Sequence, residues 1–168
     1  CNRMESLERS KYFQDREIKQ AYGKVFKDWE QQGFTKQVEM GEEVKHLLPH
    51  FPVVKTGSST PVRPVMDCST ELNKCVLAGP NLLNEVPAVL LRYRSGLYAF
   101  SGDVKQMFLQ IKLAPEDRPY HCFLWREEPE KPFTVYQHQV HVFGNAGSPF
   151  VAVYTVKSHA EDKKRQWP

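Results

Sequence analysis

Short β-rich pieces separated by turn residues constrain the fold of this 168-residue chain more than any other feature. The segment "FPVVK" (51–55) is followed by a Gly/Ser-rich turn and then by "PVRPVM" (61–66), an order that predicts two strands around a turn. A second pair joins "YHCFLW" (120–125) to "TVYQHQVHVF" (134–143) through a polar, proline-bearing loop. The chain is therefore expected to contain β-hairpins, in which neighbouring strands run antiparallel.

Three further segments carry helix signals. Residues 15–32 place apolar side chains every three or four positions, and Gly33 is a suitable end. Residues 79–96 repeat this spacing, with Pro87 expected in the first turn and Gly96 at the end. Ser148 is expected as an N-cap, with helix running to about Lys164. Helices mixed with hairpins predict the α+β class.

Composition places the chain among ordinary globular domains. Apolar residues make up 40% and charged residues 26%, and the net charge of +3 permits a polyanionic partner without requiring one. The four cysteines form no C-x-x-C pair, so we expect reduced thiols in an intracellular protein. Apolar runs fall short of the roughly 20 residues of a membrane helix, so no membrane partner is expected. Because the chain opens at Cys1, we expect it to be part of a longer reading frame.

One acidic residue stands out beside an apolar run. Residues 97–102 are nearly continuously apolar, which predicts a short buried strand with Asp103 at its carboxyl end. An isolated carboxylate is costly in such surroundings unless something binds it. Judged by its position alone, Asp103 is also consistent with an ordinary acidic residue in the turn that follows a strand.

Three segments in order resemble one enzyme family. They are "VVKTGSSTPVRPVMDCS" (53–69), "YAFSGDVKQMFLQIKL" (98–113) and "VFGNAGSPF" (142–150). Together they are similar to the reverse transcriptases of BEL/Pao-type LTR retrotransposons. The resemblance implies the fingers and partial palm of a right-hand polymerase. It assigns residues 1–78 to an N-terminal helix and fingers, 79–110 to the palm, 111–147 to a fingers hairpin and 148–168 to a truncated palm helix.

The same resemblance assigns a metal site and a sugar selector. Asp103 matches the first catalytic aspartate, and the Val104 carbonyl is a secondary ligand. The implied cofactor is Mg²⁺, two ions in the intact enzyme, with Mn²⁺ as an alternative. Phe108 matches an aromatic gate that excludes the 2′-hydroxyl of ribonucleotides, whereas composition alone makes Phe108 a core residue.

Other nucleotide contacts are implied on both sides of this segment. Lys55 and Arg63 would clamp the triphosphate, with Thr56 as an alternative to Lys55 and Arg63 as the better match. Phe143 stands where some retroviral enzymes have a glutamine that touches the sugar, and Gly144 lets the backbone approach a nucleotide. Without the resemblance, the two basic residues form a solvated hairpin and 142–150 is a plain helix start.

The implied parent enzyme extends a primer with deoxynucleoside triphosphates on an RNA or DNA template. Its partners are the template-primer and the rest of the Pol polyprotein, in the cytoplasm within a virus-like particle or in the nucleus. The family also needs a Tyr/Phe-x-Asp-Asp motif, and the sequence contains no adjacent Asp-Asp pair. The chain by itself is therefore expected to be inactive. The alternative is a non-catalytic remnant of a decayed or domesticated element, acting at most as a nucleic-acid-binding or interaction module.

Overall fold

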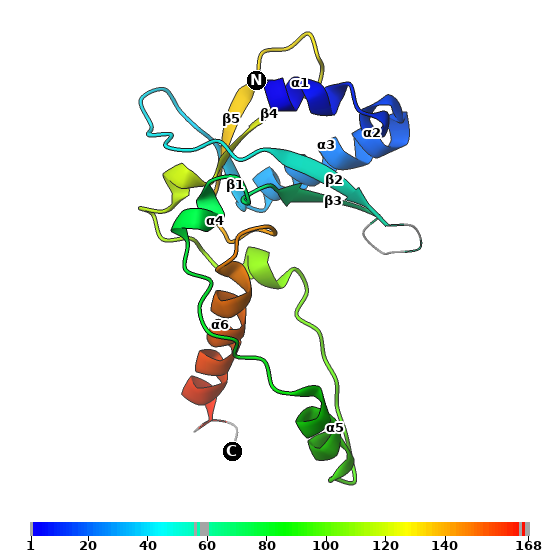
Figure 1. Ribbon diagram of the computed structural model, residues 1–168, viewed down its shortest axis with the longest axis vertical. Helices are drawn as coiled ribbons and strands as arrows, with labels where there is room; N and C mark the ends of the chain where they lie inside the picture. The colour runs from blue at the N-terminus through cyan, green and yellow to red at the C-terminus, as the bar shows by residue number, and fades with distance from the viewer. Residues whose placement is uncertain (1, 56, 58–60, 165, 167–168) are drawn as a thin grey trace.

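The computed structural model describes residues 2–55, 57, 61–164 and 166, and mixes helices with two small sheets (Figure 1). This composition agrees with the α+β class. The helices are α1 (Asn2–Glu8), α2 (Lys11–Gln14), α3 (Arg16–Gln31), α4 (Leu72–Cys75), α5 (Val86–Arg94) and α6 (Ser148–Lys163). The strands are β1 (Thr35–Gln37), β2 (His50–Val54), β3 (Val62–Met66), β4 (Cys122–Trp125) and β5 (Thr134–His138), and the 3-10 turns are η1 (Met107–Gln110) and η2 (Arg118–Tyr120).

Helix α3 forms where the apolar spacing predicted it. Asp15 caps its first turn, because its carboxylate accepts hydrogen bonds from the backbone N–H groups of Glu17 and Ile18 at 2.9 and 3.2 Å. The buried stripe consists of Tyr22, Phe26 and Trp29. The chain leaves the helix at Gly33 with a φ of 73°, a left-handed conformation that suits glycine.

Both predicted hairpins are confirmed. β2 pairs antiparallel with β3, with Val53 opposite Arg63. β4 pairs antiparallel with β5, and β1 joins the other edge of β5 to give the order β1-β5-β4.

An aromatic core joins α3 to both sheets. The Phe26 ring lies 5.2 Å from His50 of β2, and 5.1 and 4.9 Å from Phe123 and Trp125 of β4, measured between ring centroids. These are ordinary distances for aromatic pairs, which add stability beyond the apolar area they bury. The two sheets are therefore held together through one face of α3.

Helix α1 is attached to the loop after β4. The Arg126 guanidinium donates two hydrogen bonds to the Glu8 carboxylate, at 2.7 and 2.6 Å, and lies 4.1 Å from the centroid of the Phe133 ring. This fork-on-carboxylate geometry fixes orientation as well as distance. It brings together residues 118 positions apart in the chain.

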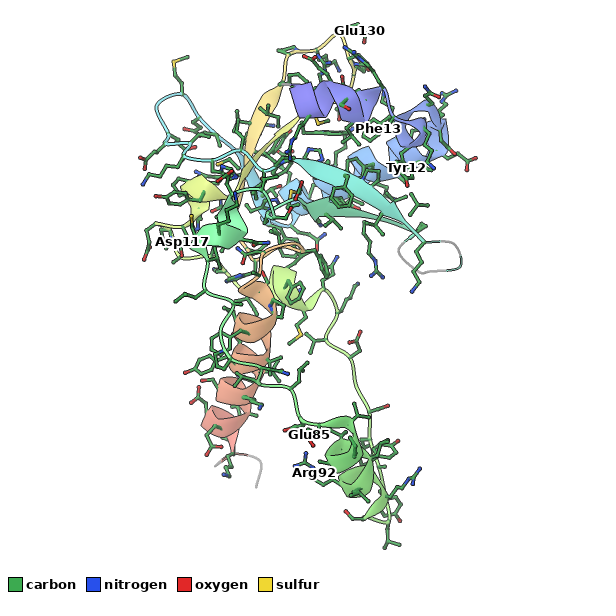
Figure 2. All side chains as sticks on the ribbon, in the orientation of Figure 1. Tyr12, Phe13, Glu85, Arg92, Asp117 and Glu130 are labelled. Atoms are coloured by element: carbon green, nitrogen blue, oxygen red, sulfur yellow. The ribbon has the colours of Figure 1, made fainter. Side chains whose placement is uncertain are left out.

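Residues 79–106 form an arm that extends away from the sheets (Figure 1). Figure 2 labels Glu85 and Arg92 at its far end, on and next to α5. All nine residues of α5 are exposed, and the helix begins at Val86, not near residue 79, with Pro87 in its first turn as expected. A helix starting at 79 would hold Pro87 in its interior, where its missing N–H is not tolerated, which is consistent with a helix that begins only at Val86.

The predicted buried strand at 97–102 is wrong. These residues are exposed and irregular, and Leu97 and Phe100 are 98% and 92% accessible. A strand requires a neighbour that completes its hydrogen-bond ladder, and both described sheets are built from other segments. Apolar content alone therefore does not make 97–102 a strand.

Helix α6 starts one residue earlier than predicted. Gly147 is the N-cap, and Ser148 is the first helical residue; its hydroxyl donates to the Val142 carbonyl at 3.0 Å instead of capping the helix. Lys157 of α6 reaches the carbonyl of Leu82 at 2.7 Å, which ties the base of the arm to this helix. Among the described residues, no helix is long and apolar enough to cross a bilayer.

Candidate functional site

One cavity collects most of the residues that the sequence singled out. It has a volume of about 670 Å³ and lies between α3, β3, the end of the arm and the segment before α6. Five of the seven predicted site residues line it: Arg63, Asp103, Val104, Phe108 and Phe143. They come from three segments separated by about 40 residues each, so the fold, not local sequence, brings them together.

Arg63 is the exposed member of a run of three β3 residues that line this cavity. Val62 and Pro64 on either side of it are buried and line the cavity as well. Lys55 lies beyond the end of β2, where its N–H donates to the Pro61 carbonyl at 2.8 Å, and it is not among the cavity-lining residues. The alternative residue, Thr56, falls outside the described residues.

Asp103 and Val104 reach the cavity from the end of the arm. Both are exposed, and the backbone around them is irregular. Within the described part of the chain, no group of three His, Cys, Asp or Glu side chains is arranged to hold a metal ion. Asp28 of α3 also lines the cavity and is the second carboxylate on its wall.

Phe108 and Phe143 form an aromatic pair on the cavity wall. Their ring centroids lie 4.8 Å apart with an interplanar angle of 67°, an edge-to-face arrangement. Phe108 is half-buried and Phe143 is 39% exposed, and both line the cavity. The pair joins 3-10 turn η1 to the loop that precedes α6.

Gln106 turns the chain between Asp103 and Phe108. Its φ of 53° and ψ of 42° place it in the left-handed region, which is uncommon for a residue with a Cβ. Its carbonyl accepts a hydrogen bond from Leu109 at 2.8 Å, and the Leu109 side chain is buried. This turn aims Phe108 at Phe143 while Asp103 stays at the cavity edge.

Gly144 is required by a close backbone contact. Its φ is 108°, and a Cβ built there would lie 1.9 Å from the Met66 carbonyl oxygen. The Met66 N–H donates to the Phe143 carbonyl at 3.2 Å, so the loop lies directly against the end of β3. The glycine expected to approach a nucleotide thus makes its close approach to the protein's own backbone.

The sequence interpretation missed several cavity residues on α3. They are Val25, Asp28, Trp29 and Gln32, at positions i, i+3, i+4 and i+7 of one helix face. This spacing is visible in the sequence, but the apolar residues of this helix were interpreted only as a buried stripe that packs on the core. Lys105 and Gln106 were missed as well, although they lie inside the quoted motif.

A larger cavity, of about 750 Å³, lies between α1, α2 and the β2 region. Its wall is mostly apolar, and its charged groups already contact each other: Arg3 lies 3.3 Å from the Asp67 carboxylate. His50 on its wall bonds to the Tyr22 hydroxyl at 2.7 Å and to the Leu124 carbonyl at 2.9 Å. Fewer groups are free for a polar ligand here than in the cavity around Arg63.

No protein-family model matches the chain, and no curated protein sequence matches it. The resemblance to reverse transcriptases therefore depends on the three quoted motifs.

Proposed function

We propose that the chain is the fingers and early palm of a BEL/Pao-type reverse transcriptase, and that the cavity around Arg63 receives the incoming deoxynucleoside triphosphate. One observation carries the proposal. Three motif segments, far apart in the sequence, contribute Arg63, Asp103, Phe108 and Phe143 to one cavity. Local folding of each motif would not require this convergence.

Each residue type suits the role proposed for it. The planar guanidinium of Arg63 can bind two phosphate oxygens at once. The edge-to-face rings of Phe108 and Phe143 offer an apolar surface for the sugar, and the Phe108 ring would clash with a 2′-hydroxyl. Discrimination between sugars would then come from exclusion.

The implied magnesium fits the donor type at Asp103. This carboxylate is exposed on the cavity wall, and Mg²⁺ prefers hard oxygen ligands while keeping several waters and substrate phosphates. Asp103 and the Val104 carbonyl would hold the ion, and the bound ion would neutralise phosphate charge. The other carboxylates of the implied two-ion site would come from the rest of the Pol polyprotein, together with the template-primer groove.

Nucleotide binding to this chain tests the proposal directly. We expect dATP with Mg²⁺ to shift the amide NMR signals of Arg63, Val104 and Phe143. Arg63→Gln should weaken this binding, whereas Lys55→Gln, a matched loss of charge on the same hairpin outside the cavity, should not. Shifts confined to the cavity between α1 and β2, or equal effects of both variants, would refute the assignment.

Catalysis is tested in a protein extended through the downstream reading frame. Asp103→Asn should abolish primer extension, and Phe108→Ala should raise the incorporation of ribonucleotides relative to deoxynucleotides. Equal extension by the wild type and Asp103→Asn would remove Asp103 from the mechanism. If the chain binds nucleotide, the extended protein does not extend a primer, and the downstream reading frame is interrupted, the alternative is supported instead. The chain would then be a non-catalytic remnant of a decayed or domesticated element.

A further inference from the structure

The loop 143–147 begins with Phe143, which lines the cavity, and two asparagine side chains hold the backbone of this loop. Asn73 of α4 donates to the Gly144 carbonyl and accepts from the Ala146 N–H, both at 2.9 Å. Asn145 accepts from the Gly147 N–H at 2.8 Å. Each amide group satisfies backbone atoms that no regular element would otherwise bond.

Asn145 is itself held by His121, which follows η2. The Asn145 amide nitrogen lies 2.9 Å from His121 Nε2, and His121 Nδ1 lies 3.0 Å from the Asp117 carbonyl oxygen. A carbonyl oxygen only accepts, so Nδ1 must carry the proton. Nε2 is then the acceptor of a neutral ring, and the Asn145 NH₂ is the donor.

We propose that His121, acting through Asn145, is a positioning residue for the loop 143–147, and that it fills this role only as the neutral Nδ1–H tautomer. Phe143 is the residue of this loop that lines the cavity, so the protonation state of His121 determines how firmly the backbone next to Phe143 is held. The geometry of the loop does not depend on which ligand the cavity takes. The consequence for nucleotide binding rests on the function proposed above.

Protonation of His121 cannot be accommodated by a simple amide flip. In the imidazolium both ring nitrogens donate, so Nε2–H would face the Asn145 NH₂ donor. Flipping Asn145 would give Nε2–H an oxygen, but would then set the NH₂ against the Gly147 N–H, which also donates. One hydrogen bond is lost in either orientation. His121 and Asn145 are only 4% and 7% exposed, so water cannot readily replace it.

The surroundings of His121 keep it neutral at physiological pH. Burial lowers the pKa of His121, and the nearby His46 acts in the same direction, while the Asp117 carbonyl and carboxylate oppose both. Two further histidines, His138 and His141, also lie close enough to His121 to interact electrostatically with it. Asp117, whose carbonyl accepts the hydrogen bond from His121 Nδ1, is labelled in Figure 2.

Amide hydrogen exchange on the 168-residue chain measures the loop without any nucleotide. We expect the protection factors of Ala146 and Gly147 to fall about tenfold as pH drops below the ordinary histidine pKa, equivalent to one hydrogen bond of about 1.4 kcal/mol. The amides of Phe123 and Trp125 in β4 serve as the control for global unfolding. If the loop amides had the same protection factors as the β4 amides throughout this pH range, the loop would exchange only by global unfolding, and the proposal would be overturned.

Two variants separate this role from mere packing. His121→Gln removes the titration, so loop protection should become flat between about pH 5 and 8. Asn145→Asp should reverse the pH dependence, because a carboxylate prefers a protonated Nε2 and would raise the pKa of His121. An unchanged pH profile in Asn145→Asp would refute the proposal.

A measurement on the wild type covers the case in which a variant fails to fold. Long-range ¹H–¹⁵N spectra of the imidazole report its tautomer. An Nε2–H ring for His121 at neutral pH would overturn the assignment, and an Nδ1–H ring is the expected result. None of these readouts involves nucleotide, so failure of the nucleotide proposal leaves them intact.

Discussion

Replacing Gly144 by alanine should destabilise the chain far more than an ordinary loop substitution. A residue with a Cβ at a φ of 108° costs about 1–3 kcal/mol in backbone strain. The new Cβ would also lie 1.9 Å from the Met66 carbonyl oxygen, a backbone atom that cannot rotate away. Relief requires the loop and β3 to separate, which breaks the Met66 N–H bond to Phe143, worth about 1 kcal/mol. The sum is about 2–4 kcal/mol.

Gly33→Ala is the matched control for this experiment. Gly33 also has a positive φ, of 73°, but a Cβ there would meet no atom of the described part of the chain within 4 Å. That variant should lose only the conformational term, about 1–2 kcal/mol. The difference between the two variants isolates the close approach of loop and strand.

Urea denaturation followed by the fluorescence of Trp29 and Trp125 measures both losses. With an m-value of about 2 kcal/mol/M, Gly144→Ala should lower the midpoint by about 1–2 M and Gly33→Ala by about 0.5–1 M. Equal midpoints for the two variants would show that the loop does not lie against β3 in solution. A loss for Gly144→Ala smaller than that for Gly33→Ala would refute the reasoning entirely.

Three more outcomes can be checked on the same chain. Burial lowers the pKa of His50 from 6.5 to about 4, so the unfolded chain takes up the proton first and the free energy of unfolding should fall by about 3 kcal/mol between pH 6.5 and 4; His50→Gln should remove that pH dependence from the urea midpoints. Both ring nitrogens of His138 are buried without hydrogen-bond partners among the residues that the structure describes, so His138→Leu should raise the free energy of unfolding by about 1 kcal/mol, and a lower urea midpoint would contradict this. Trypsin should cut first in the exposed arm, between Arg92 and Lys105, and mass spectrometry showing first cuts in α3 would contradict the arm's exposure.

Local sequence patterns predicted the elements that are specified by residues within one short segment. The apolar spacing and end signals of 15–32 predicted α3 to within about one residue at each end, because a helix closes its hydrogen bonds within itself. The hairpins were predicted for a related reason, since turn residues specify which strand pairs with which. The short strand β1 carried no such signal and forms only because β5 offers an edge.

Sequence reasoning failed where an element depends on partners from elsewhere. The apolar run 97–102 needs a sheet neighbour, and its side chains lie exposed in the structure. For the candidate site, the motifs predicted Arg63, Phe108 and Phe143, which line one cavity, but nothing in the motifs indicated that Asn145 would contact His121, 24 residues earlier. Such pairs depend on how the loop before α6 folds over η2, which spacing does not encode.

Asp103 is exposed in the structure, whereas the sequence predicted it at the end of a buried strand. A carboxylate at the end of a buried strand would need a cation to offset its desolvation, but Asp103 and its neighbours are exposed and carry no such cost. Its place on the cavity wall comes instead from the turn at Gln106 and the buried anchor Leu109. One exposed carboxylate binds divalent ions weakly, so Mn²⁺ alone should broaden the Val104 amide signal no more than those of other exposed acidic segments.

Adding a deoxynucleoside triphosphate should change that result, because its phosphates supply the ligands that a single carboxylate lacks. Mn²⁺ with nucleotide should then broaden the Val104 and Phe143 signals selectively, and Asp103→Asn should abolish the selectivity at Val104. Selective broadening at Val104 without nucleotide would mean that the chain already holds a complete ion site there. If Asp103→Asn loses this selectivity but still binds nucleotide, the ion is located at Asp103 and the nucleotide at Arg63. The cavity brings these two residues together from separate segments of the chain.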